Sequence, residues 1–246
     1  MLIHPTIDKM KEMKLHGMAR ALESQLELKE ARELSFEERL GMLLDSEALD
    51  RENRQTSSRL KSAKLRLNAC VEDLKFKAIR GLDRRLITAL SSCDWIRDKC
   101  RIRITGATGT GKTYVACALG HCACRHGFSV VYFRAHPLFD DLVVAKADGR
   151  HKTIMSSIEK KRVLILDDFG LEVLTAESRR DLLEIMESRY GISSTIITSQ
   201  LPTDNWHDAI GDPTIADAIL DRTVHNTYDI KLKGPSMRDP KSDENG

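Results

Sequence analysis

Apolar residues in the first hundred positions recur mostly at spacings of three and four, which is the pattern of amphipathic helices. We expect one helix within residues 6–34 and a second that begins at Ser35, where Ser35 and Glu38 form a capping box. A third helix should run from about residue 50 to 67, and residues 68–100 again place apolar side chains near helical spacing. This part of the chain is therefore predicted to be helical throughout.

From residue 101 onward, short apolar runs alternate with helical segments. The predicted strands are a short one from residue 101, then 128–133, 162–170, 194–200 and 227–230. The third run is continuously apolar until it ends in two carboxylates, so it should be a strand buried on both faces of a parallel sheet. The pattern predicts an α/β fold in which a parallel sheet lies between helices.

The turn between the first strand and the next helix reads Gly-Ala-Thr-Gly-Thr-Gly-Lys-Thr, over residues 106–113. Its glycines let backbone N–H groups converge on a triphosphate, Lys112 can reach the β- and γ-phosphates, and the Thr113 hydroxyl can bind Mg²⁺. A glycine-rich turn that binds nothing is the alternative, but a phosphate loop must follow a buried strand and open a helix, as this turn does. The predicted nucleotide-binding residues are Gly106, Ala107, Thr108, Gly109, Thr110, Gly111, Lys112, Thr113 and Tyr114.

Two carboxylates close the third predicted strand, and a glutamine closes the fourth. Because ligands bind outside the carboxyl ends of parallel strands, Asp167, Asp168 and Gln200 should lie on the same side as the phosphate loop. We expect Asp167 to hold the Mg²⁺ shell and Asp168 to orient or deprotonate the attacking water. The alternative for the acidic pair is two aspartates that cap a helix or shape a turn. ATP and Mg²⁺ are therefore the predicted cofactors.

The length of 246 residues and the hydrophobic content of 41% suffice for one α/β domain plus an appendage. No run approaches the roughly 18 apolar residues of a membrane-spanning helix, and the amino end lacks the features of a signal peptide. We expect a cytoplasmic protein with no membrane partner. The six cysteines include no Cys-x-x-Cys pair. We interpret them as reduced, mostly buried thiols, with Cys117 and Cys124 on one packed helix face rather than in a metal site.

The net charge of +2 is unevenly distributed along the chain. Residues 1–50 carry net −4 and residues 104–246 net −3, whereas residues 51–103 hold 15 Lys and Arg against 6 Asp and Glu. This basic belt, residues 51–103, suggests a polyanionic partner, and the predicted helix at 50–67 is the best candidate for DNA contact. It offers cations on a regular element but no base-reading motif, so sequence-specific binding is not indicated. A solvated helical face is the alternative.

Besides the phosphate loop, four stretches of sequence are distinctive. The five motifs are Gly106–Thr113, Leu164–Gly170, Ile197–Pro202, Gly211–Arg222 and Lys233–Arg238. Together they resemble the IstB family, the ATPase helpers of insertion-sequence transposition, which are related to the DnaC helicase loaders. The resemblance extends over nearly the whole chain, and the last two motifs separate IstB-like chains from other P-loop proteins.

The resemblance implies an AAA+ ATPase that assembles as an ATP-dependent homo-oligomer on double-stranded DNA and presents this target to a partner transposase. It also implies that Arg222 is the arginine finger of a neighbouring subunit, that Arg238 is the second sensor in cis and that Gln200 is the first sensor. AAA+ proteins usually have Asp-Glu where this chain has Asp167-Asp168, and Asn at the first sensor, so we expect slow turnover. The alternatives are a helix-terminal cation for Arg222 and a mobile tail cation for Arg238.

The predicted organisation has four parts. They are a helical N-terminal domain over 1–67 that binds partner or DNA, a helical linker over 68–100, an AAA+ ATPase domain over 101–238 and a disordered tail over 239–246. The runner-up function is a DnaC-like helicase loader, which would act through a replicative helicase and prefer single strands. A scaffold that binds nucleotide and DNA without hydrolysis is a third possibility.

Overall fold

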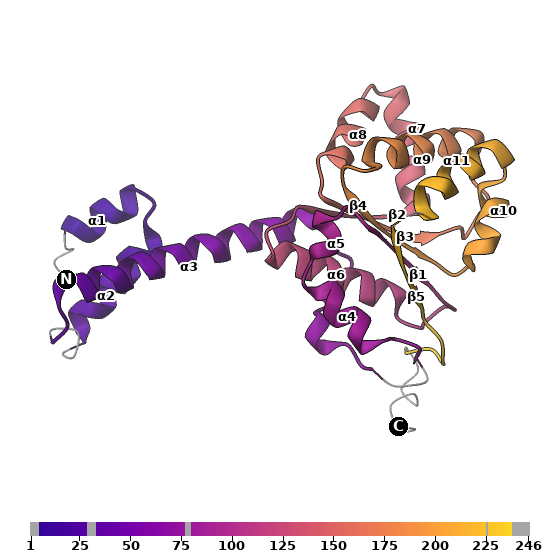
Figure 1. The fold of residues 1–246 in the computed structure, drawn as a ribbon. Helices are drawn as coiled ribbons and strands as arrows, with labels where there is room; N and C mark the ends of the chain where they lie inside the picture. Colours follow the sequence, from indigo (N-terminus) through magenta and orange to yellow (C-terminus); the bar gives the residue numbers. More distant parts are fainter. Residues whose placement is uncertain (1–4, 29–32, 77–79, 225, 238–246) are drawn as a thin grey trace. The chain divides into compact units, whose positions relative to one another are not determined.

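The computed structural model describes residues 5–28, 33–76, 80–224 and 226–237. Contacts within the chain divide it after Ser58 into two compact units (Figure 1). The described part of the first unit is helical, and the second unit contains the sheet. No helix in the described ranges is long and apolar enough to cross a membrane.

The N-terminal unit contains α1, α2 and most of α3. Their bounds are Pro5–Glu12, His16–Glu27 and Phe36–Ala63. Where we expected a single helix within residues 6–34, the left-handed backbone of Lys14 (φ 60°) separates α1 from α2. The predicted capping box before α3 is confirmed, because the Ser35 N–H donates to the Glu38 carboxylate (2.8 Å) and the Glu38 N–H donates to the Ser35 hydroxyl (3.2 Å).

The buried carboxylate of Glu47 joins α3 to the start of α2. It accepts hydrogen bonds from the backbone N–H groups of Gly17 (2.8 Å) and Met18 (3.3 Å), two donors that lack partners inside their own helix. The negative charge also lies where the dipole of α2 favours it. Gly17 permits this approach, since a Cβ there would lie 2.4 Å from the carbonyl oxygen of Ser46.

The described α3 is one continuous helix, so the separate second and third helices that we expected, with a boundary near residue 50, are wrong. No glycine or proline interrupts residues 42–63. Two ion pairs, each between residues one helical turn apart, connect the parts that we had separated. They join Arg51 to Glu47 (2.7 Å) and Arg54 to Asp50 (2.8 Å). The acidic residues near position 50 therefore stabilise the interior of a helix instead of starting a new one.

The second unit is built on a five-stranded sheet in the order β2-β3-β4-β1-β5, in which every neighbouring pair is parallel. Its strands are β1 (Arg101–Thr105), β2 (Val130–Arg134), β3 (Val163–Phe169), β4 (Ser194–Ser199) and β5 (Thr227–Lys231). The apolar runs of β3 and β4 lie inside the sheet and are buried along nearly their whole length. The predicted parallel sheet is confirmed.

Helices cover both faces of this sheet (Figure 1). One face carries η2 (Val71–Asp73), α4 (Arg84–Ser91), α5 (Asp94–Arg97) and α6 (Lys112–Arg125). The other carries α7 (Ala135–Ala147), α8 (His151–Glu159), α9 (Ala176–Arg189), η4 (Thr203–Asn205), α10 (Trp206–Ile210) and α11 (Pro213–Val224). Alternate residues of β3 supply the two cores, Val163 and Ile165 the first, Leu164 and Leu166 the second. The predicted α/β fold is confirmed.

Segments within residues 68–100 pack directly onto the sheet. Leu82, Leu90 and Trp95 belong to the same buried cluster as Ile102 of β1. The Trp95 indole N–H donates to the Leu90 carbonyl oxygen (3.0 Å), which fixes the short turn between α4 and α5. These residues are thus part of the second unit, and the functional division into four parts stays a prediction.

The carboxyl ends of β3, β4 and β1 meet at one edge of the sheet, because these strands are parallel neighbours. The glycine-rich loop follows β1, the two adjacent aspartates end β3, and Gln200 follows β4. The topology therefore brings the three predicted groups of functional residues to the same place.

Candidate nucleotide-binding site

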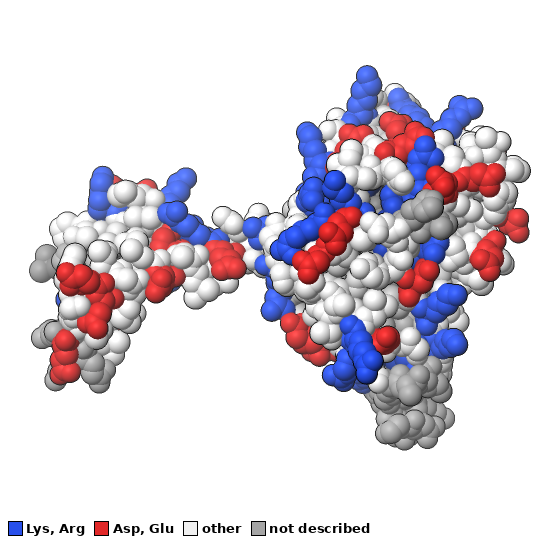
Figure 2. Space-filling model, viewed as in Figure 1, with Lys and Arg blue, Asp and Glu red and all other residues white. Residues whose placement is uncertain are grey.

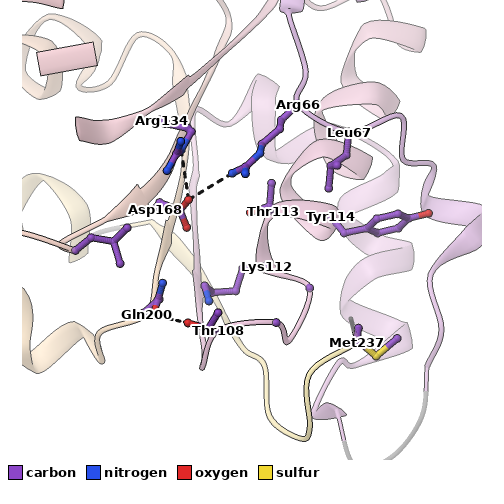
Figure 3. Close-up of a pocket in the computed structure, with 13 residues that line it drawn as sticks. Arg66, Leu67, Thr108, Lys112, Thr113, Tyr114, Arg134, Asp168, Gln200 and Met237 are labelled. Carbon is purple, nitrogen blue, oxygen red and sulfur yellow. Dashed lines mark hydrogen bonds and ion pairs between the residues drawn. The ribbon is translucent and has the colours of Figure 1, made fainter. Parts of the chain in front are cut away.

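A pocket of about 420 Å³ opens at this edge of the sheet (Figure 3). Its lining residues are Arg66, Leu67, Thr108, Gly109, Gly111, Lys112, Thr113, Tyr114, Arg134, Asp168, Leu171, Gln200 and Met237. Eight of them were predicted from the sequence as nucleotide-binding or catalytic residues. The predicted residues of the loop and of β3 that do not line the pocket are Gly106, Ala107, Thr110 and Asp167, of which Thr110 and Asp167 are buried.

Two glycines of the phosphate loop adopt left-handed conformations that other residues rarely adopt, Gly109 at φ 82° and Gly111 at φ 93°. A Cβ on Gly109 would lie 2.1 Å from the hydroxyl oxygen of Ser236. Gly111 is the residue directly before α6, so its backbone sets the direction in which that helix starts. The loop therefore aims the N-terminus of α6 at the pocket, an arrangement that favours an anionic ligand.

Lys112 begins α6, and its side chain folds back over the loop. Its ammonium donates to the carbonyl oxygens of Gly106 (2.7 Å) and Ala107 (2.9 Å). The residue is buried, and its charged end lies at the pocket between the loop and Asp168 (Figure 3). A cation in this position strengthens the preference of the helix N-terminus for phosphate.

Asp167 is fully buried, and three hydroxyl groups donate to its carboxylate. They belong to Thr113 (3.0 Å to each oxygen), Tyr132 (2.6 Å) and Thr198 (2.6 Å). Burial, followed by the hydrogen bond to Asp167, raises the pKa of Tyr132 above its ordinary value. Mg²⁺ prefers hard oxygen ligands and retains several waters, so the paired Thr113 hydroxyl and Asp167 carboxylate beside the loop fit this ion.

Asp168 reaches the pocket because β3 is irregular at this point. Adjacent residues of a regular strand point to opposite faces, but the register between β3 and β4 shifts between Leu166 and Phe169. Asp168 has a left-handed backbone (φ 58°), and its N–H donates to the Thr198 hydroxyl (3.0 Å). The bulge thereby places two consecutive carboxylates, Asp167 and Asp168, on the same side of the sheet.

Two arginines that sequence reasoning missed face the Asp168 carboxylate (Figure 3). Nitrogens of Arg66 and Arg134 lie 3.5 and 3.6 Å from its Oδ2 atom. Arg134 ends β2 opposite Asp167, so its position at the carboxyl end of a strand was a usable signal. Arg66 follows α3 and comes from outside the sheet, and nothing in its sequence spacing indicates this contact. Tyr132 and Thr198 were missed as well, since only strand register places them beside Asp167.

Gln200 lies in the pocket, as predicted from its place after β4. Its side-chain oxygen accepts a hydrogen bond from the Thr108 hydroxyl (2.7 Å) of the phosphate loop. A polar group here would meet the end of a phosphate chain that lies along the loop. Its role as first sensor stays a prediction.

Arg222 is outside the pocket lining. It lies on α11, where its guanidinium donates to Glu187 (2.8 Å) and to the carbonyl oxygen of Ala218 (2.6 Å). The function of Arg222 in a neighbouring subunit therefore stays a prediction. Arg238 lies outside the described residues, but the segment just before it touches the loop, since the Met237 N–H donates to the Gly109 carbonyl oxygen (2.8 Å).

A second cavity, of about 270 Å³, adjoins the first. Its lining residues are Asp73, Leu74, Lys75, Arg80, Gly111, Tyr114 and Met237, and the last three also line the first pocket. The buried Arg80 guanidinium donates to the carbonyl oxygens of Lys75 (2.7 Å) and Thr110 (3.3 Å), whereas its Nε has no hydrogen-bond partner among the described residues. Burial lowers the pKa of Arg80.

A parallel sheet with a phosphate loop after β1, a buried acid at the end of β3 and a polar residue after β4 defines a P-loop NTPase of the AAA+ type. The model of the IstB-like ATP binding proteins matches residues 8–245, so the chain belongs to that family.

The relatives agree with this assignment. The chain is 49% identical over 238 residues to a protein of Sinorhizobium fredii named as an insertion sequence ATP-binding protein, covering 97% of each. It is 31% identical over 226 residues to the protein named as the ATP-binding protein of insertion sequence IS21 in Pseudomonas aeruginosa, covering 92% of this chain and 85% of the relative.

Solved structures show the same fold at low identity. The DnaC helicase loader superposes with a TM-score of 0.57 at 20% identity, covering 70% of this chain and 100% of the loader. The replication initiator DnaA bound to AMPPCP and single-stranded DNA gives a TM-score of 0.57 at 19% identity, covering 70% of this chain and 52% of DnaA. These neighbours place the fold within the AAA+ class.

Proposed function

We propose that this protein hydrolyses ATP with Mg²⁺, binds double-stranded DNA as an ATP-dependent homo-oligomer and assists the transposase of an insertion sequence. The observation that carries the proposal is the joint placement of Lys112, the Thr113–Asp167 pair and Asp168 around one pocket. These are the groups that phosphoryl transfer requires. The names of the relatives support the connection with insertion sequences.

In this proposal the triphosphate lies along the loop in the first pocket, and the base enters the adjoining cavity. Lys112 would exchange its two carbonyl contacts for phosphate oxygens, and the Thr113 hydroxyl with Asp167 would hold Mg²⁺. The aromatic ring of Tyr114 and the side chain of Met237, both shared by the two cavities, offer an apolar surface to the base.

Hydrolysis requires a group that orients or deprotonates the attacking water, and Asp168 is the carboxylate in the pocket that remains for this step. Its ion pairs with Arg66 and Arg134 hold the side chain at the pocket wall. The same two guanidinium groups lie where negative charge on a transferred phosphoryl group would be stabilised. Asp is shorter than the Glu that is usual here, so we retain the expectation of slow turnover.

For DNA we propose the α3–α8 basic surface, which we define as Lys61, Lys64, Lys152, Lys160 and Lys161. Figure 2 shows Lys and Arg side chains gathered over α8 and the adjoining end of α3. A shallow groove on α8 is lined by three of these lysines together with Thr153, Ser156 and Ser157. The Lys161 ammonium donates to the Ser62 hydroxyl (3.1 Å), which joins α8 to the last turn of α3. Cations and hydroxyls of this kind bind phosphates without reading bases.

The first experiment measures binding of the purified chain to a random-sequence duplex and to a single strand of equal length, each with and without ATP and Mg²⁺, alongside phosphate release. We expect large ATP-dependent assemblies on the duplex and a slow release of phosphate. Binding to single strands alone would favour the helicase-loader function instead. Binding without phosphate release would favour a scaffold that does not hydrolyse ATP.

A second experiment tests the DNA surface. The logarithm of the duplex-binding constant falls linearly with the logarithm of the salt concentration. Replacing Lys152 and Lys160 with Ala should reduce the magnitude of this slope by about 0.9 for each phosphate contact removed. ATP hydrolysis without DNA should not change. Lys231→Ala, an exposed lysine on β5, is the matched control and should leave the slope unchanged. An unchanged slope in the double variant would move the DNA contact elsewhere.

A further inference from the structure

Two cysteines and a histidine converge on the face of the sheet that α6 covers. Cys93 lies in the turn between α4 and α5, Cys122 lies in the last turn of α6, and His126 directly follows that helix. Both thiols are buried, at 1% and 4% exposed, whereas His126 is exposed to solvent. Neither the phosphate loop nor the pocket uses any of the three residues.

Two of the distances within this cluster match those of a tetrahedral metal centre. The two sulfurs lie 4.0 Å apart, and the Cys122 sulfur lies 3.6 Å from Nδ1 of His126. Zinc bonds of about 2.3 Å to sulfur and about 2.05 Å to nitrogen, at tetrahedral angles, would separate two sulfurs by about 3.8 Å and sulfur from nitrogen by about 3.6 Å. The ligand atoms of all three residues lie within 4.8 Å of one another.

We propose that Cys93, Cys122 and His126 form a binding site for Zn²⁺, with water as the fourth ligand on the exposed side. Two thiolates neutralise the divalent ion, so a buried pair of cysteines can hold it without leaving net charge in the core. Thiolates and an imidazole select zinc over the hard Mg²⁺ ion of the nucleotide pocket. Binding releases the two thiol protons, and His126 retains one proton on Nε2.

The surroundings of the cluster act on its two thiols in opposite directions. The contact with Cys93, followed by the nearby His126, lowers the pKa of Cys122, and the same sulfur contact together with burial raises the pKa of Cys93. The carbonyl oxygen of Ser91 accepts from both thiols, at 3.4 Å from Cys122 and 3.8 Å from Cys93. Nδ1 of His126 lies 3.0 Å from the Cys122 carbonyl oxygen, a contact that metal binding would replace.

The charged groups around the site balance one another. Arg97 and Arg125 favour the thiolate forms, whereas Asp94, which pairs with Arg97 (2.5 Å), has the opposite effect on Cys93. Arg125 in turn pairs with Glu72 (2.6 Å).

The chain contains a matched control pair. The Cys70 sulfur lies 3.9 Å from Nδ1 of His121, but among the residues that the structure describes no third ligand lies close enough to complete a metal site with them. Burial raises the pKa of Cys70 and lowers the pKa of His121. Two donors of this kind are too few for a stable zinc site, so Cys70→Ser should leave metal binding unchanged.

The test is a titration of the full, reduced chain with Co²⁺, followed by competition with Zn²⁺. We expect one equivalent of Co²⁺ to produce thiolate-to-metal absorption in the near ultraviolet and the visible bands of tetrahedral cobalt, both removed by Zn²⁺. Cys122→Ser and His126→Ala should each weaken binding at least about tenfold. Since His126 is exposed, its replacement leaves the core intact, and circular dichroism verifies the fold of each variant.

Lys112→Ala separates this site from the nucleotide pocket, because it should remove ATP binding and keep the cobalt spectrum. The absence of thiolate absorption in the parent chain would overturn the zinc proposal, as would an unchanged spectrum in folded Cys122→Ser or its loss in Cys70→Ser. These outcomes do not depend on ATPase activity or DNA binding, so the zinc site and the proposed function can fail separately.

Discussion

The hydroxyl of Tyr132 provides a sharp test of the buried acid at the centre of the site. Tyr132→Phe removes one of three hydroxyl donors to Asp167, a hydrogen bond of 2.6 Å, and leaves the ring in place. A hydrogen bond to a charged group contributes about 1.5–3 kcal/mol to the free energy of unfolding. For a chain of this size, each kcal/mol lost from the free energy of unfolding lowers the thermal midpoint by about 2–4 °C. The midpoint of Tyr132→Phe should therefore lie on the order of 5 °C below that of the parent chain.

The assay is thermal unfolding by circular dichroism at neutral pH, with Tyr228→Phe as the control, because Tyr228 is exposed on β5. A double-mutant cycle supplies the specific test, since Tyr132→Phe should cost less in an Asp167→Asn background, where the carboxylate charge is absent. A fall no larger than that of Tyr228→Phe would refute the reasoning. An equal cost in both backgrounds would assign the effect to ring packing instead of the hydrogen bond.

Four further predictions concern pH, catalysis and assembly. The pKa of Tyr132 is raised in the folded state, so as pH rises the unfolded state loses the phenol proton first. The free energy of unfolding should therefore fall above about pH 10, and less steeply in Tyr132→Phe than in the parent chain. Thermal unfolding midpoints measured between about pH 8 and 11 test this. Asp168→Asn should keep binding of a fluorescent ATP analogue and slow phosphate release by about 10²-fold or more; normal release would assign the base elsewhere. Lys112→Ala should abolish analogue binding in a titration, and unchanged affinity would contradict the phosphate-loop assignment. Mixing Arg222→Ala with Lys112→Ala chains should restore part of the phosphate release if the arginine acts in a neighbouring subunit, and no recovery at any ratio would argue against this role.

The sequence was sufficient for the phosphate loop and for the positions of the strands along the chain, because both depend on local chemistry. The glycines, Lys112 and Thr113 are contiguous, and an apolar run such as β3 has few alternatives to a buried strand. The topology then brought Asp168 and Gln200 to the pocket as predicted. Local chemistry was also enough for the capping box before α3.

Features that depend on contacts distant in sequence could not be predicted in the same way. Tyr132 and Thr198 meet Asp167 through strand register, and Arg66 arrives from a segment outside the sheet. Two errors in the predicted helices have a related reason: the break between α1 and α2 was not predicted, and the predicted break near residue 50 is absent. A left-handed lysine can end a helix without glycine, and acidic residues can lie inside a helix when arginines one turn away pair with them.

The left-handed backbone of Asp168 also bears on which amino acids this position can accept. Residues with a short polar side chain, such as Asp and Asn, enter this region of conformational space more readily than longer ones, because they bond to their local backbone. A glutamate at 168 would add reach but would bear a conformational cost of order 1 kcal/mol or more in the same bulge. The departure from the usual Asp-Glu pair thus has a backbone explanation: the bend in β3 selects the shorter acid, and the same bend makes Asn the least disruptive replacement.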